Sequence, residues 1–211
     1  MTEWDEQKRR ESKFRTFLSR IPKEHSFDAE DRAALRTLAR YAKVFPAKHI
    51  FKYFGESKPD AVLILDGVAA RVRLTEKGSR RILGFVLAGE LSIAPTSTAY
   101  ATYELIAQGA CLAVTVPWYT LRMLEQEHSN IRRFLEWHAQ KEICVLQDKF
   151  VAMSGAQVEE KLTYLLEDIY SRLENVEKAE SGRMSLPLKQ RDMADAVGAS
   201  VVQVSKTLSK M

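Results

Sequence analysis

The residues with the most distinctive chemistry lie near the end of the 211-residue sequence, after the glycine at position 198. Gln203 carries an amide, which can bind both edge atoms of an adenine base, and Lys206 carries a cation, which can reach guanine or a phosphate. Val201 or Val202 can pack against the methyl group of thymine. These residue types in one short segment predict a surface that contacts double-stranded DNA.

Two short helices would position these side chains. The first is predicted over 189–197, where Met193, Ala194 and Val197 share one face. Gly198 has the backbone freedom that a tight turn needs, and Ser200 is placed to cap a second helix. In a helix-turn-helix, the start of the second helix enters the major groove of DNA. We therefore expect DNA contacts from Lys189, Gln190, Ser200, Val201, Val202, Gln203, Ser205 and Lys206.

The valines of the second helix have two interpretations. Val201, Val204 and Leu208 recur at spacings of three and four, which is typical of the buried face of a helix. We expect Val204 to belong to the core of a small helical domain. Val202 stays open between that core and a contact with a base.

The charge distribution weakens the prediction of DNA binding. The net charge is +4, but residues 1–55 carry 13 Lys and Arg against 8 Asp and Glu, whereas residues 154–211 carry 8 against 9. The DNA-reading end is therefore not basic, although phosphate contacts supply much of the affinity for DNA. A dimer could compensate by bringing together Lys189, Arg191, Lys206 and Lys210.

The composition, 45% hydrophobic and 28% charged, is that of an ordinary globular protein. No apolar run approaches the roughly 20 residues that span a bilayer, and the first residues lack the apolar stretch of a secretory signal. The two cysteines, Cys111 and Cys144, form no paired motif, so we expect neither a zinc site nor disulfides. We expect a cytoplasmic protein without a cofactor or a membrane partner.

The first two thirds of the chain alternate between two patterns. Helices are predicted over 9–21 and 28–44, and short strands over 61–74, 82–87, 103–107 and 112–116, with turns at Asp66-Gly67 and at 76–79. Closely spaced turns predict a small antiparallel barrel or roll. A helix over 129–153 follows, whose apolar seam needs a partner, either its own roll or a second copy. A helix over 156–173 and a polar connection over 174–185 lead to the helix-turn-helix.

Three stretches resemble the Crp–Fnr family of bacterial transcription regulators: residues 65–91 with their Gly-Glu-Leu ending, residues 157–166, and residues 186–208. The resemblance implies an α+β protein. An antiparallel β-roll or jelly-roll sensor domain with its N-terminal helices would occupy 1–128, and a long dimerisation helix would occupy 129–154. A C-terminal winged helix-turn-helix would occupy 155–211, with the wing absent because the sequence stops at Met211. The implied partners are DNA, a second copy and RNA polymerase.

The resemblance also locates an effector pocket. In cyclic-nucleotide-binding members, Gly-Glu-Leu opens a short helix around the ribose and phosphate, an Arg-Ser or Arg-Thr pair holds the phosphate, and a polar pair on the long helix reads the base. The corresponding residues here are Gly89, Glu90, Leu91, Tyr100, Ala101, Leu146 and Gln147.

Residues 82–121 contain no Lys, Arg or His, so a bound phosphate would lack a neighbouring cation, and we expect no cAMP or cGMP. A pocket for an apolar or neutral effector stays open, but we favour a filled core.

Other sensing chemistries have weaker support. Residues 1–50 lack the cysteines of iron–sulfur members, and the four histidines show no haem-ligand arrangement. We expect His138 to be a satisfied interface or surface residue, and Cys111 and Cys144 to be buried structural thiols. The alternative to a DNA-binding regulator is a sensing or interaction module that has lost DNA binding. An enzyme is disfavoured, because residues 82–121 lack general bases and cations.

Overall fold

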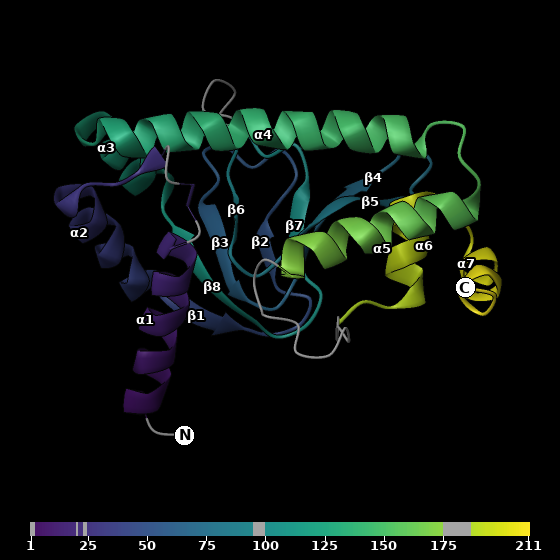
Figure 1. The fold of residues 1–211 in the computed structure, drawn as a ribbon, viewed down its shortest axis with the longest axis horizontal. Helices are drawn as coiled ribbons and strands as arrows, with labels where there is room; N and C mark the ends of the chain where they lie inside the picture. Colours follow the sequence, from purple (N-terminus) through teal and green to yellow (C-terminus); the bar gives the residue numbers. More distant parts are fainter. Residues whose placement is uncertain (1–2, 20, 23–24, 95–99, 175–186) are drawn as a thin grey trace.

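A computed structural model describes residues 3–19, 21–22, 25–94, 100–174 and 187–211. A β-roll lies in the middle, helix α4 (Ser129–Met153) crosses it, and helices gather at both ends (Figure 1). The N-terminal helices cover one end of the roll, while the helix-turn-helix lies at the other. The expected α+β class, with antiparallel sheets and helices, is confirmed.

The roll consists of two four-stranded antiparallel sheets, with strand orders β1-β8-β3-β6 and β2-β7-β4-β5. Alternate residues of the strands point into the space between the sheets, where Val62, Ile64, Leu105 and Ala113 form a core. The strands span Ala42–Phe45 (β1), Ile50–Lys52 (β2), Ala61–Asp66 (β3), Ala69–Leu74 (β4), Arg80–Val86 (β5), Glu90–Ser92 (β6), Glu104–Ala107 (β7) and Cys111–Val116 (β8).

The N-terminal helices are α1 (Glu3–Ser19) and α2 (Ala29–Thr37), followed by the 3-10 helix η2 (Leu38–Tyr41). Asp28 caps α2 in a capping box with Asp31, as the sequence predicts for that start. The predicted extension of this helix to residue 44 is wrong, because residues 42–45 form β1 and pair with β8. Phe45 precedes a proline, which disfavours helical backbone at that residue.

Two long helices follow the roll and the short helix α3 (Trp118–Glu127). α4 has the bounds that the sequence predicts, and its first third packs on the roll through Ile131, Phe134 and Leu135. α5 (Val158–Glu174) follows after the break at Gly155. Most of the predicted polar connection over 174–185 lies outside the described residues. No helix of the described chain is both long enough and apolar enough to span a lipid bilayer.

A second core joins the C-terminal helices to the outer face of the roll. α6 (Gln190–Val197) and α7 (Val201–Leu208) pack with α5 against β4 and β5. Leu162 and Ile169 of α5, Phe85 of β5 and Val204 of α7 are nearly inaccessible to solvent. This core determines which side of α7 faces outward.

The two contested valines of α7 are separated by burial. Val204 is 0% exposed, whereas Val202 is 63% exposed. Val204→Ala should lower the free energy of unfolding by about 2 kcal/mol, because it removes two buried methyl groups and leaves a cavity. Val202→Ala is the matched control and should change it by less than about 0.5 kcal/mol. Urea unfolding of both variants measures the difference, and equal losses would contradict this core.

Candidate DNA-reading surface and roll interior

The helix-turn-helix has the predicted local geometry. Gly198 ends α6 in the left-handed conformation, with φ of 70°, which suits glycine. Ser200 caps α7: its Oγ accepts from the Gln203 backbone N–H at 3.2 Å, and its own N–H donates to Gln203 Oε1 at 3.0 Å. This capping box satisfies amides at the start of α7, so the helix begins sharply at Val201.

Most of the residues predicted to contact DNA are exposed. Ser205 alone of the predicted set is half-buried, and the exposed ones are Lys189, Gln190, Ser200, Val201, Val202, Gln203 and Lys206. Gln203 is already engaged, because its Oε1 accepts from both the N–H and the Oγ of Ser200. A bidentate contact with adenine needs that oxygen, so the base would compete with the capping box. The contact roles of these residues remain predictions.

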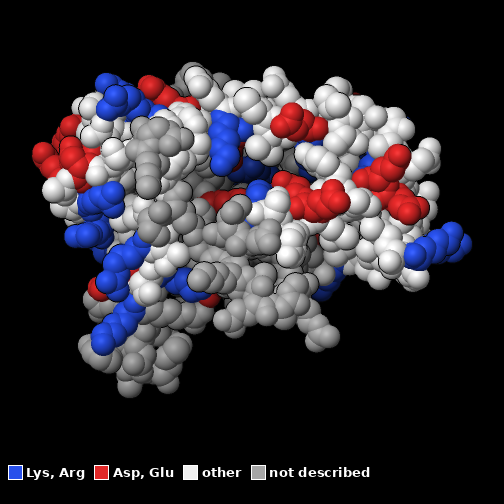
Figure 2. Space-filling model, viewed as in Figure 1, with Lys and Arg blue, Asp and Glu red and all other residues white. Residues whose placement is uncertain are grey.

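The acidic residues of α6 face the roll, away from the exposed side of α7. Arg80 of β5 donates to Asp192 at 3.0 Å and to Asp195 at 2.6 Å. Sequence reasoning missed Arg80, which lies more than 100 residues from both partners. The nearly neutral charge count of residues 154–211 therefore includes carboxylates that are paired with the roll. Figure 2 shows Lys and Arg side chains at the outer end of the molecule, where α7 lies.

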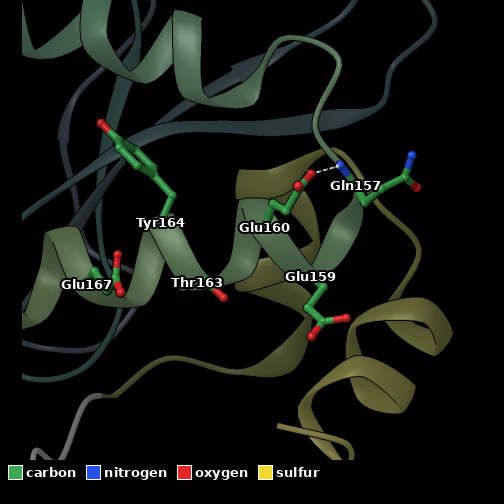
Figure 3. Close-up of a pocket in the computed structure, with 6 residues that line it drawn as sticks. All are labelled: Gln157, Glu159, Glu160, Thr163, Tyr164 and Glu167. Atoms are coloured by element: carbon green, nitrogen blue, oxygen red, sulfur yellow. Dashed lines mark hydrogen bonds between the residues drawn. The ribbon is translucent and has the colours of Figure 1, made fainter.

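Another group of carboxylates lies along a groove on α5 (Figure 3). The Glu160 carboxylate accepts from the backbone N–H of Gln157 at 2.7 Å and caps the start of the helix. Acidic side chains repel phosphate, so this groove is unsuited to DNA. Its lining residues are Gln157, Glu159, Glu160, Thr163, Tyr164 and Glu167.

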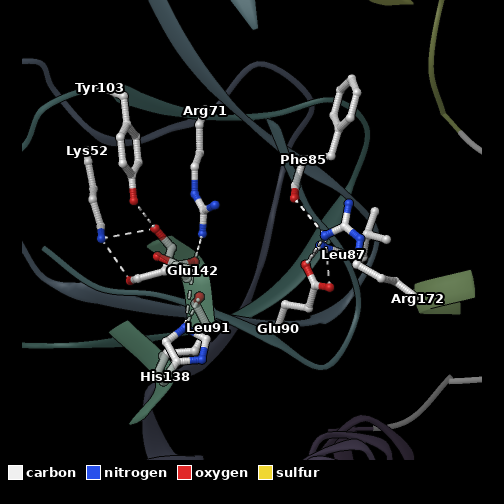
Figure 4. Close-up of polar contacts among 11 residues, drawn as sticks. Lys52, Arg71, Phe85, Leu87, Glu90, Leu91, Tyr103, His138, Glu142 and Arg172 are labelled. Atoms are coloured by element: carbon white, nitrogen blue, oxygen red, sulfur yellow. Dashed lines mark hydrogen bonds and ion pairs between the residues drawn. The ribbon is translucent and has the colours of Figure 1, made fainter. Parts of the chain in front are cut away.

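The roll interior contains cations that the count over residues 82–121 does not include. Lys52 of β2 is 1% exposed, and its Nζ donates to the Ser92 carbonyl at 2.8 Å (Figure 4). Arg71 of β4 forms an ion pair with Glu142 of α4. The premise that no cation lies near the pocket, and the preference for a filled core, are therefore wrong. Strands β2 and β4 precede the counted segment, and the fold brings them beside it.

The Gly-Glu-Leu motif has a different role from the one that the resemblance implies. Glu90 and Leu91 belong to strand β6, which pairs with β3, and do not open a helix. The Glu90 carboxylate accepts from the Leu87 N–H at 3.0 Å and from Arg172 of α5 at 2.9 Å. Glu90 therefore ties α5 to the roll. Residues 95–99, which follow β6, lie outside the described residues.

The other predicted effector residues are not gathered at one place. Tyr100 is exposed, while the adjacent Ala101 is buried. Leu146 and Gln147 of α4 are exposed, and the α4 side chains that hydrogen-bond to roll residues nearby are His138, Glu142 and Lys149. Lys149 donates to the Leu83 carbonyl of β5 at 2.7 Å. An effector role for the predicted set stays a prediction.

The remaining reactive side chains are resolved by burial. His138 Nε2 hydrogen-bonds the Leu91 carbonyl at 3.0 Å, so it is satisfied as expected, and burial lowers the pKa of His138. Cys111 is buried, as predicted, and desolvation raises its pKa. The same prediction for Cys144 is wrong, because Cys144 is exposed on α4. The apolar residues around it in the sequence belong to a helix face that is open in the single chain.

The comparisons with known proteins agree with this architecture. The chain is 27% identical over 186 residues to the transcriptional activatory protein AadR of Rhodopseudomonas palustris, covering 86% of this chain and 74% of AadR. It is 28% identical over 151 residues to the nitrogen fixation regulation protein FixK of Bradyrhizobium diazoefficiens, covering 70% of this chain and 62% of FixK. No protein-family model matches the chain.

Among solved structures, FixK2 from Bradyrhizobium japonicum superposes with a TM-score of 0.72 at 20% identity, covering 80% of this chain and 83% of FixK2. A β-roll, a long helix and a C-terminal helix-turn-helix define a class of sensor-regulator architecture. Together with the curated relatives, this fold places the chain in the Crp–Fnr family of transcription regulators, with a cyclic-nucleotide-binding-like roll. The resemblance seen in the sequence is confirmed.

The buried Lys52 gives a testable pH dependence. Burial, reinforced by the nearby charge of Arg71, lowers the pKa of Lys52 from 10.5 to about 7. Between these pH values the unfolded chain binds more protons than the folded protein, so stability rises with pH. From pH 7 to pH 9, urea unfolding should show the wild type gaining roughly 2 kcal/mol relative to Lys52→Met.

The exposed Lys43 of β1 supplies the control for that measurement. Lys43→Met should leave the pH profile of the wild type unchanged, because an exposed lysine keeps its proton in both states over this range. Parallel profiles for the wild type and Lys52→Met would show that Lys52 is not buried as described.

Proposed function

We propose that this Crp–Fnr regulator acts as a homodimer that places one α7 helix from each subunit into successive major grooves of a palindromic DNA site. Binding near a promoter would recruit or block RNA polymerase in the cytoplasm, and cAMP would not be required. One observation carries the proposal: α7 begins at a sharp, capped turn and exposes its first three residues, Val201, Val202 and Gln203, beside Lys206.

The geometry of α7 supports contact with a groove. Val204 and its buried neighbours hold one side of the helix against α6 and α5. Val202, Gln203 and Lys206 are three or four residues apart, so they share the opposite side. The start of the helix also presents the positive end of its dipole to a phosphate. This arrangement supplies side chains for bases and a backbone terminus for the DNA strand.

The second half of α4 supports the homodimer. Ile143 is 56%, Leu146 is 49% and Phe150 is 75% exposed, although they recur at the spacing of an apolar helix face. An exposed row of this kind on a soluble chain marks an interaction surface. A second α4 offers the same row and would bury both, as in a two-fold interface. Two DNA-reading helices would then be aimed at one duplex.

The proposal of cAMP independence rests on the residues near the roll interior. Tyr100 and Ala101 stand at the positions of the phosphate-binding pair, and neither carries a cation. Arg71 is held by Glu142, and Arg172 by Glu90 and Asp168. A cyclic nucleotide would have to break one of these pairs. Direct titration with cAMP, followed by thermal unfolding, should show no stabilisation.

The DNA contacts can be tested on a site selected from random duplex DNA. Gln203→Ala with Lys206→Ala should weaken binding by about 1–3 kcal/mol for each base that the variant no longer recognises, and should relax the sequence preference. Gel shift of wild type and variant at the same salt concentration measures both effects. No retardation of the wild type even in 50 mM salt would favour a sensing or interaction module without DNA binding.

Two controls separate contact with DNA from helix capping. Gln203→Glu keeps an oxygen for the Ser200 capping box but removes the amide donor, so it should fold normally and still lose DNA affinity. Lys43→Ala, on the exposed side of β1, should leave affinity within twofold of the wild type. Unchanged sequence preference in the Gln203 and Lys206 double variant would contradict the proposed readout.

The dimer has its own test on α4. Phe150→Glu places a charge in the middle of the exposed apolar row, so it should convert the dimer to a monomer without unfolding the chain. Sedimentation velocity measures the mass, and circular dichroism checks the fold. Lys141→Glu, on another face of α4, is the control and should remain dimeric. A wild type that sediments as a monomer at micromolar concentration would contradict the proposal.

A further inference from the structure

A polar cluster lies inside the roll beneath α4, where an apolar core would be expected (Figure 4). Lys52 donates to the carbonyl of Ser92 at 2.8 Å, and the Ser92 hydroxyl hydrogen-bonds the Tyr103 hydroxyl at 2.8 Å. Arg71 lies beside them, with its guanidinium 5.5 Å from the centre of the Tyr103 ring. Two cations thus occupy one enclosed region, which is costly unless anions compensate them.

Arg71 is only partly compensated. Its Nη2 pairs with the Glu142 carboxylate, but its Nε is buried and has no hydrogen-bond partner among the described residues. An arginine offers Nε and Nη2 as parallel donors along one edge, which matches the two oxygens of a carboxylate or phosphate. Glu142 reaches this edge from α4 and contacts one donor of the two. The edge is therefore built for an acid group that Glu142 does not fully replace.

Lys52 adds a second cation to the same place. The charges that act on it are Arg71, Glu142, Asp60 and Glu56, with Arg71 opposing its protonation and the three carboxylates favouring it. Burial and Arg71 lower its pKa to about 7, so an anion arriving nearby would be joined by a proton. Lys52 and Arg71 together carry more positive charge than Glu142 alone can balance.

We propose that this cluster is a binding site for a small ligand with a carboxylate or phosphate group, which would bind Arg71 through Nε and Nη2 beside Lys52 and displace Glu142. The inference extends the proposed function, because it names the chemistry that the roll would sense. A hollow between α4 and α5, with Lys and Arg side chains on its wall, is visible in Figure 2 and offers a route inward. Glu142 occupies the place of the ligand in this structure.

Displacement of Glu142 would act on the helix that we propose pairs the two subunits. The Arg71–Glu142 pair joins the roll to α4, so its loss changes how tightly α4 is held. Arg71 also lies on the β4–β5 hairpin, whose other strand carries Arg80 and binds α6. One hairpin thus contacts both the ligand site and the DNA-reading pair, and a ligand could bias their relative position.

The test is chemical rescue of a variant that lacks the Glu142 charge. Glu142→Gln should melt at a lower temperature than the wild type, because Arg71 loses its counter-ion. Acetate or inorganic phosphate should then raise its melting temperature by about 3 °C or more over chloride at equal ionic strength. The wild type should respond less, because Glu142 competes. A response to acetate alone or to phosphate alone identifies which acid group fits.

The double variant Arg71→Gln with Glu142→Gln supplies the decisive control, since it removes the proposed binding edge while leaving a neutral pair of similar size. It should show no selective response to either anion. Glu136→Ala, at an exposed position of α4, controls for loss of any glutamate. The proposal is overturned if Glu142→Gln responds equally to chloride, acetate and phosphate, or if the response survives without Arg71. These measurements use protein without DNA, so their failure is distinct from a failure to bind DNA.

Discussion

One apolar core, shared by the roll, α5, α6 and α7, determines how the DNA-reading helix is presented. Val204 of α7 and Ile169 of α5 are fully buried in it, with Phe85 of the roll. Because helical side chains three and four apart share a face, burial of Val204 leaves Val202 and Gln203 in solvent. The exposed surface of α7 is therefore a consequence of packing on its opposite side.

Electrostatic pairs join the same parts in addition to the core. Arg80 binds two carboxylates of α6, and Arg172 of α5 binds Glu90 of the roll. Each pair is partly buried, where charge pairs are screened less than at the surface. The pairs also keep acidic groups of the C-terminal helices away from the exposed side of α7. The nearly neutral C-terminal segment is thus compatible with a surface that meets phosphates.

The helix-turn-helix and α4 could be predicted from the sequence because their signals are local. Gly198, the Ser200 cap and the spacing of Val204 and Leu208 lie close together in the chain, and α4 contains no glycine or proline to interrupt it. Strand β1 was missed because it forms by pairing with β8, which lies far along the chain. The cations of the roll interior were missed for the same reason: Lys52 and Arg71 come from strands outside the segment that the family motif marks. Long-range pairing brings these groups together, and no local pattern records it.

The central claim, that two copies of the chain aim their α7 helices at one duplex, is tested most directly by a hydroxyl-radical footprint on a selected DNA site. The account predicts two protected half-sites related by a palindrome, with centres one helical turn of about 10 base pairs apart. Protection of a single half-site, or protection without any two-fold relation in its sequence, would contradict it.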